Sequence, residues 1–145
     1  MESELILKKL KEKFGPGVIE TETRSYKRCT ATIDPANITE VAEYLYKDEG
    51  FRFIIASGLH TRRGFEIHYH FSFDNTGLIL NIHVILNPEK PSIESLSNLF
   101  NASNWIEREI HEILGIDFIN HPDPEKLISE GNWAEGVYPY RKEFK

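Results

Sequence analysis

The chain has 145 residues, of which 40% are hydrophobic and 28% are charged, and its formal net charge is −6. This length suits one domain with a modest core, and the acidic balance argues against a nucleic-acid-binding protein, which would need a basic face. The sequence has neither a run of eighteen apolar residues nor a signal-type N-terminus. We therefore expect a protein that neither spans a membrane nor is secreted. The single cysteine, Cys29, cannot form an intramolecular disulfide or a thiolate metal site, so we expect a small buried hydrophobe there.

The first third of the chain alternates between helix-like and strand-like patterns. Apolar residues at helical spacing predict helices, and alternating residues predict strands. A possible capping box of Asn37 and Glu40 opens the second helix, and Asp34-Pro35 marks the turn before it. The predicted elements are a helix over residues 4–14, strands over 18–24 and 28–33, and a helix over 37–48.

Three longer strands follow, over residues 51–60, 65–73 and 77–86. The short turn-like segments between them, at residues 62–64 and 74–77, predict an antiparallel meander. In the second of these strands aromatic and aliphatic residues alternate with polar ones, so one face is expected to be apolar and the other polar.

The polar face of this meander carries several histidines. His68 and His70 are two residues apart and point to the same face, and His83 could join them from the next strand. With Glu66 as a carboxylate, such a set could bind zinc or iron, which gives a stand-alone metal-binding domain or metalloenzyme as the alternative function. A polar sheet face that is wetted or covered by a partner explains the same residues without a metal.

The last part of the chain is read as two helices and a tail. Ile93, Leu96, Leu99 and Phe100 predict a helix over residues 92–100. A second, amphipathic helix follows from Trp105 to Leu114, with a possible capping box of Asn104 and Glu107. Gly115 can take the left-handed conformation that ends it. From residue 131 the chain has aromatic and charged residues without a period, which predicts an extended tail over 131–145 after one domain over 1–130.

The order of residues in and after this helix resembles the signature of the 30 kDa-type subunit of respiratory complex I, also called the C subunit. That family also has relatives in membrane-bound energy-converting hydrogenases. The matching residues are Glu107-Arg108-Glu109, Glu112, Ile113-Leu114, Gly115, Phe118, His121-Pro122 and Asp123. The segment YPYRKEF, residues 138–144, is similar to the PLRKDF-like tail of the same family. Together these matches cover about the last third of the chain.

One departure from the family pattern follows Asp123. Where the family continues with leucine and two arginines, this chain has Pro124-Glu125-Lys126. Glu125 takes the place of an arginine that could contact an acidic partner surface, and this difference indicates a divergent branch of the family.

The order of the predicted elements indicates a two-layer α+β fold, with helices on one face of a mainly antiparallel or mixed sheet of about five strands, and the resemblance agrees with this fold. The resemblance also implies a peripheral, cofactor-free subunit of NADH:quinone oxidoreductase or of an energy-converting [NiFe] hydrogenase. Such a subunit would dock beside the hydrogenase-like large subunit and the small iron–sulfur subunit, which would hold the iron–sulfur clusters or the NiFe centre. It would lie in the cytoplasm, held at the inner face of the membrane by its partners. The expected docking residues are Glu107, Arg108, Glu109, Glu112, His121, Pro122, Asp123, Arg141 and Lys142.

Overall fold

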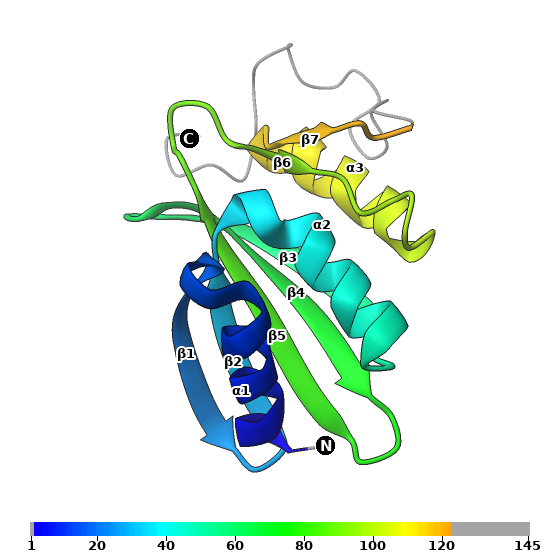
Figure 1. Cartoon of the computed structure of the whole chain (residues 1–145). Helices are drawn as coiled ribbons and strands as arrows, with labels where there is room; N and C mark the ends of the chain where they lie inside the picture. Colours follow the sequence, from blue (N-terminus) through cyan, green and yellow to red (C-terminus); the bar gives the residue numbers. More distant parts are fainter. Residues whose placement is uncertain (1, 123–145) are drawn as a thin grey trace.

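A five-stranded mixed sheet forms the centre of the computed structural model, which describes residues 2–122 (Figure 1). The strands lie in the order β1-β2-β5-β4-β3. Strands β2 and β5 pair in parallel, and the other neighbours are antiparallel. The strand bounds are β1 Val18–Ser25, β2 Arg28–Ile33, β3 Arg52–Thr61, β4 Gly64–Phe73 and β5 Leu78–Leu86. The predicted α+β fold and its meander of three strands are therefore confirmed.

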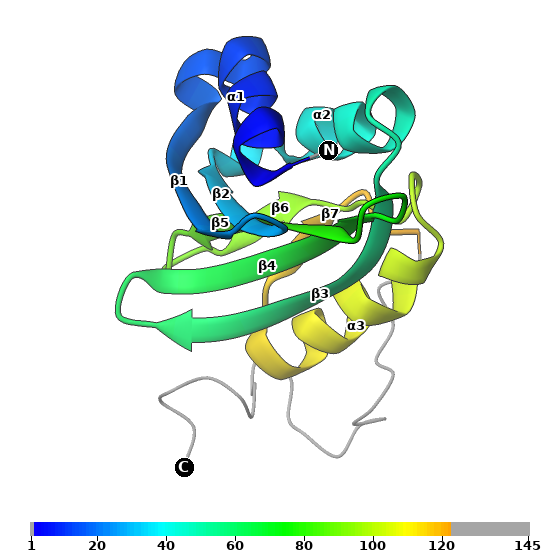
Figure 2. The same cartoon turned by 90° about the horizontal axis from the view of Figure 1, so that it is seen from below.

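Helices α1 (Ser3–Phe14) and α2 (Ile38–Glu43) lie side by side over one face of this sheet (Figures 1 and 2). Helix α3 (Ala102–Leu114) packs on β3 beside the edge of the sheet. Its Leu114 and Ile110 side chains contact the position of Gly58. Because Gly58 is paired with the buried Ile67, α3 covers the same side of the pleat as the other helices.

The alternation of residues in β4 decides which side chains enter the core. Phe65, Ile67, Tyr69 and Phe71 point toward the helices and are buried. The residues between them, Glu66, His68, His70 and Ser72, point to the opposite side, which we call the open face of the sheet. Cys29 in β2 is buried in the same core, as predicted.

The predicted helix over residues 92–100 is wrong. The segment begins as strand β6 (Ser92–Glu94), which pairs in parallel with β7 (Asp117–Ile119), and it continues as turns. The backbone N–H of Ser95 donates to the carbonyl of Ile119, and that of Leu96 donates to the carboxylate of Glu107. In a helix over 92–100 the N–H of Leu96 would have donated to the Ser92 carbonyl, and here the Glu107 carboxylate accepts it instead. Tertiary contacts therefore override the local apolar spacing.

Both predicted capping boxes are wrong as well. Before α2 the side chain of Asp34 accepts a hydrogen bond from the N–H of Ala36, and Asn37 forms no capping bond. A short 3₁₀ turn, η2 (Pro35–Asn37), precedes α2, and a π-helical turn, η3 (Tyr44–Asp48), continues it. Another 3₁₀ turn, η1 (Gly15–Gly17), follows α1.

Helix α3 begins at Ala102, earlier than predicted, and ends at Gly115, whose φ of 76° is the expected left-handed C-cap. Position 104 therefore lies inside the helix, where it cannot act as the N-cap. The domain boundary at residue 130 and the tail over 131–145 were predictions about residues outside the described part of the chain.

Candidate functional site

The helix with the signature residues is held to the rest of the domain by the buried carboxylate of Glu107. This side chain is 1% exposed. Its Oε1 accepts hydrogen bonds from the hydroxyls of Ser95 at 2.5 Å and Ser97 at 2.8 Å. Its Oε2 accepts from the Ser103 hydroxyl and the Leu96 N–H, both at 2.8 Å. A buried carboxylate is stable when such donors replace water, and Glu107 thereby ties α3 to the segment after β6.

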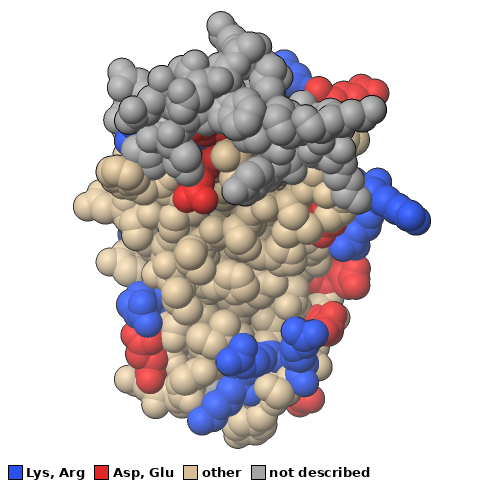
Figure 3. Space-filling model, turned by 180° about the vertical axis from the view of Figure 1, so that it is seen from behind, with Lys and Arg blue, Asp and Glu red and all other residues tan. Residues whose placement is uncertain are grey.

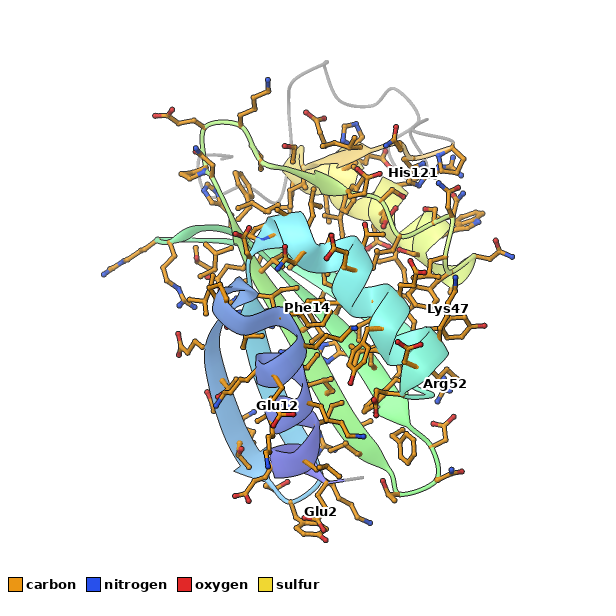
Figure 4. The ribbon with its side chains drawn as sticks, in the orientation of Figure 1. Glu2, Glu12, Phe14, Lys47, Arg52 and His121 are labelled. Carbon is orange, nitrogen blue, oxygen red and sulfur yellow. The ribbon has the colours of Figure 1, made fainter. Side chains whose placement is uncertain are left out.

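Two histidines of the signature region, His111 and His121, line one cavity with Glu107, and His121 is labelled in Figure 4. The Nε2–H of His121 donates to the Asn104 carbonyl at 3.1 Å and lies 3.7 Å from Oε1 of Glu107. The Nδ1–H of His111 donates to the Ile116 carbonyl at 2.9 Å. With Arg108, Asp117 and Phe118, these residues line a small cavity of about 90 Å³ between α3 and β7. The signature therefore forms an ordered polar cluster that connects α3 to β7.

The outer side of α3 carries the signature residues that face solvent. Glu109 is exposed and Arg108 is partly exposed, while Glu112 is 4% exposed. Trp105 is 63% exposed, and the guanidinium of Arg108 lies 5.6 Å from the centre of its indole ring. An exposed tryptophan with a stacked arginine is the kind of pair that is enriched at protein interfaces.

The predicted docking residues thus divide into three groups. Glu107 and Glu112 are buried, so any effect of Glu107 on docking would come through the position of α3. Arg108 and Glu109 lie on its outer side, and His121 and the exposed Pro122 follow β7. The remaining predicted residues, Asp123, Arg141 and Lys142, lie outside the described part of the chain. The docking role of the whole set stays a prediction.

The histidine cluster predicted on the open face forms in part. His68 and His83 are direct neighbours in the β4–β5 register, and their rings stack with centroids 4.4 Å apart. His70 is paired with Asn81 and stays outside this cluster. His83 is buried, with one ring nitrogen 2.9 Å from the Thr32 hydroxyl and the other 2.5 Å from the Glu66 carboxylate.

Burial and neighbouring side chains of the same domain shift the pKa values of Glu66 and His68. Burial raises the pKa of Glu66, but hydrogen bonds from Thr61 and His83 and the charge of Arg63 outweigh it and lower the pKa overall. Burial and the neighbouring His83 lower the pKa of His68, which favours its neutral form. A 280 Å³ pocket on the open face is lined by both histidines and by polar and charged side chains of β1 and β2, among them Glu20 and Glu22.

Glu66, His68 and His83 place one ligand atom each within 4.8 Å of one another, which is close enough for a shared ion. The ring orientation argues against a prepared metal site, because an imidazole nitrogen binds a metal along a lone pair in the plane of its ring. The two rings are only 13° from parallel, so one ion cannot lie in both planes. Hydrogen bonds to Thr32 and Glu66 already occupy both nitrogens of His83. The arrangement fits a hydrogen-bonded, stacked pair.

Sequence reasoning missed the three serines that bind Glu107. Ser95, Ser97 and Ser103 are 6–7% exposed or fully buried, and all three hydroxyls donate to one carboxylate. A signal was present, because two serines closely precede α3 and a third, Ser103, lies in its first turn, four residues before Glu107. The predicted helix over 92–100 obscured this pattern, because a helix there would place Ser95 away from the apolar residues Ile93, Leu96 and Phe100.

The family model of the respiratory-chain NADH dehydrogenase 30 kDa subunit matches residues 31–145. The chain belongs to this family, which confirms the resemblance.

Two relatives of different complexes are similar to the chain over most of its length. The C subunit of NADH-quinone oxidoreductase from Chelativorans sp. is 31% identical, with 93% of this chain and 68% of the relative covered. The C subunit of F(420)H(2) dehydrogenase from Methanosarcina mazei is 30% identical, with 100% and 93% covered. Formate hydrogenlyase subunit 5 of Escherichia coli is 26% identical, and the chain spans 24% of its length.

Solved structures share the fold. The trypsin-resistant fragment of Nqo5 has a TM-score of 0.68 at 23% identity, covering 81% of this chain and 98% of that one. A chain of the membrane-bound sulfane sulfur reductase, an archaeal respiratory membrane complex, has a TM-score of 0.76 at 21% identity, covering 98% and 85%. Among the helices in residues 2–122, none has the length and apolar character needed to cross a membrane.

Proposed function

We propose that this chain is a peripheral subunit of a complex I-like redox complex, either an NADH:quinone oxidoreductase or a relative that uses another electron donor. The observation that carries the proposal is the family match over residues 31–145. It is supported by two relatives, 31% and 30% identical to this chain, that belong to complexes named after different electron donors, NADH and F(420)H(2). This breadth fits a subunit whose task is common to the whole class and independent of the donor.

The task we propose is assembly. The chain docks beside the hydrogenase-like large subunit and the small iron–sulfur subunit and fixes their relative position. Those neighbours hold the redox centres, and this chain carries no cofactor of its own. The complex is bound to the membrane through other subunits, with this chain on the cytoplasmic side.

The outer side of α3 supports a docking role. Trp105 and Arg108 form an exposed aromatic–cation pair there, next to the exposed Glu109. Aromatic residues and arginine contribute most to interface energies, whereas charges at the rim set orientation. Glu107, buried below them, holds this side of the helix at a defined position through its four hydrogen bonds.

The substitution Arg108→Ala tests this proposal. We expect the isolated chain to remain folded, with a loss in the free energy of unfolding of at most about 1–2 kcal/mol, because the Arg108 side chain is partly exposed and lines the cavity between α3 and β7. In the complex purified through a tag on this chain, the yield of the two neighbouring subunits should fall several-fold.

Lys8→Ala is the matched control, since Lys8 is a well-exposed cation on α1 with a 73% exposed side chain. Its yield should equal that of the wild type. Equal yields of the partner subunits with Arg108→Ala and Lys8→Ala would contradict a docking role of α3.

A further inference from the structure

The open face of the sheet has a composition that solvation alone does not explain. Register across four strands places Thr30, Asn81, His70 and Ile55 in one row. The adjacent row has Thr32, His83, His68 and Ser57. A solvated sheet face in a protein with 28% charged residues would be expected to carry lysine and glutamate at such positions. On these four strands the rows contain neutral hydrogen-bonding and apolar side chains. On the edge strand β1 they end at the exposed Glu22 and Glu20, so charge is confined to the margin of the face.

Apolar surface adjoins these rows on the edge strand β3. Ile55 is 49% exposed and Leu59 is 40% exposed, and both point to the open face, four residues apart along β3. The view onto this face shows a broad uncharged centre, with acidic and basic side chains gathered at its margins (Figure 3). A neutral centre with a charged rim is the usual anatomy of a protein interface.

One margin of the open face is basic. Arg24, Lys27 and Arg28 belong to the hairpin that joins β1 and β2, and all three are exposed. Within residues 2–122 these three residues form no ion pair, although the chain as a whole is acidic. Figure 3 shows Lys and Arg side chains gathered at the lower end of this face. Unpaired cations beside a neutral surface would be complemented by carboxylates.

The hairpin that carries these cations is fixed to α1. The backbone N–H of Ser3 donates to the Tyr26 carbonyl at 3.0 Å, and the Ser3 hydroxyl donates to the Ser25 carbonyl at 2.8 Å. The Tyr26 hydroxyl donates to the Glu2 carboxylate at 2.5 Å. The basic margin is therefore held at a defined place relative to the sheet, as a docking contact requires.

From these observations we infer that the open face is a second docking surface of this subunit. It binds a neighbouring protein chain whose contact area is neutral opposite the two rows and acidic opposite the β1–β2 hairpin. The inference rests on the proposed function, because it assigns a surface to the assembly role. A lipid surface fits less well, since three cations supply only about 1 kcal/mol each at an anionic membrane, and the neutral rows would gain nothing from headgroups.

Thiol labelling tests the inference, because the chain's single cysteine, Cys29, is buried and gives a low background. We introduce Ser57→Cys on the open face, with Leu59→Cys as a second position if the first variant folds poorly. Glu109→Cys reports on α3. Glu12→Cys is the control, because Glu12 lies on α1 away from the open face and its side chain is 67% exposed (Figure 4).

Maleimide labelling rates are compared between the free chain and the complex purified through a tag on this chain. The inference predicts that the complex slows labelling of Ser57→Cys by about tenfold or more, because an interface core excludes solvent, and leaves Glu12→Cys unchanged. A zero-length carbodiimide should also join Lys27 to an aspartate or glutamate of another subunit, and this product should disappear with Lys27→Gln.

Three outcomes count against parts of the account and can be told apart. If Ser57→Cys labels equally fast in both states while Glu109→Cys is protected, the open-face inference is overturned and the proposed function stands. If the tagged chain brings no redox subunit with it, the proposed function itself fails. If vesicles of equal parts phosphatidylcholine and phosphatidylglycerol protect Ser57→Cys in the free chain as well as the complex does, a membrane replaces the protein partner.

Discussion

Removing the Glu107 carboxylate should destabilise the isolated chain strongly, although Glu107 belongs to a charged signature that would ordinarily be assigned to the surface. The substitution Glu107→Ala takes away the acceptor of four hydrogen bonds at 2.5 to 2.8 Å in a site that is 1% exposed. The serine hydroxyls can rotate toward one another, but the fixed N–H of Leu96 cannot. A buried donor without a partner costs about 1–3 kcal/mol, so the N–H of Leu96, the poorer hydrogen bonding of the three serines and the lost packing together give about 3–5 kcal/mol.

Two further variants separate this effect from a general effect of removing charge. Glu107→Gln keeps the shape and one acceptor oxygen, and we expect a smaller loss of about 1–2 kcal/mol. Glu109→Gln, on the exposed side of the same helix, should stay within about 0.5 kcal/mol of the wild type. Urea unfolding followed by far-UV circular dichroism measures all three free energies. A loss below about 1 kcal/mol for Glu107→Ala would refute the conclusion that this carboxylate anchors α3.

Two more predictions concern the sheet. Gly58→Ala should lower the free energy of unfolding by about 1–3 kcal/mol. The added Cβ would lie 3.0 Å from Leu114 Cδ1 and 3.1 Å from Ile110 Cγ2 and would push α3 away from β3. Urea unfolding measures this change, and an unchanged midpoint would contradict the packing of α3 on β3. Acidification should lower the free energy of unfolding as the pH falls from about 6.5. Burial depresses the folded-state pKa of His68 and His70, so the unfolded chain binds protons at a higher pH than the folded chain does. Each histidine contributes a slope of at most about 1.4 kcal/mol per pH unit. Replacing both histidines with glutamine should flatten this slope, whereas an unchanged slope would assign it to other groups.

Much of the fold could be predicted from the sequence, because the strands have clear local signals. The alternation of Phe65 to Phe73 and the short turns on either side specify β3, β4 and β5 and their antiparallel order. The same turn lengths fix the register, so the pairing of His68 with His83 was within reach of sequence reasoning. The left-handed Gly115 at the end of α3 was also a local signal. These elements depend on neighbours in the chain, which is why the sequence pattern suffices.

The site around Glu107 could not be predicted in the same way, because its partners are brought together by tertiary structure. Ile93, Leu96 and Phe100 have the spacing of a helical stripe, yet they are buried from a short strand and the turns after it. What decides between these structures is the pairing of β6 with β7 and the reach of Glu107 to Leu96 and the serines. A glutamate in a helix gives no local sign that buried hydroxyl and N–H donors from other segments will surround its carboxylate.

The structure also changes how the family signature is understood. Of its first three residues, Glu107 faces inward and holds α3. The outward positions are Glu109, which is exposed, and Arg108, which is partly exposed beside the cavity between α3 and β7. We therefore expect substitutions at Glu107 to affect stability and assembly together. Substitutions at the two outward positions should affect assembly alone, which makes the free energy of unfolding of the isolated chain the discriminating measurement.

The most direct test of the account is the protein composition and metal content of the complex isolated through a tag on this chain. Quantitative mass spectrometry should find this chain in equal amount with a hydrogenase-like large subunit and a small iron–sulfur subunit, and iron should be absent from this chain once it is separated from them. Recovery of the chain alone from its source, or an isolated chain that holds stoichiometric iron or zinc and turns over a substrate, would contradict the assembly role on which the account is built.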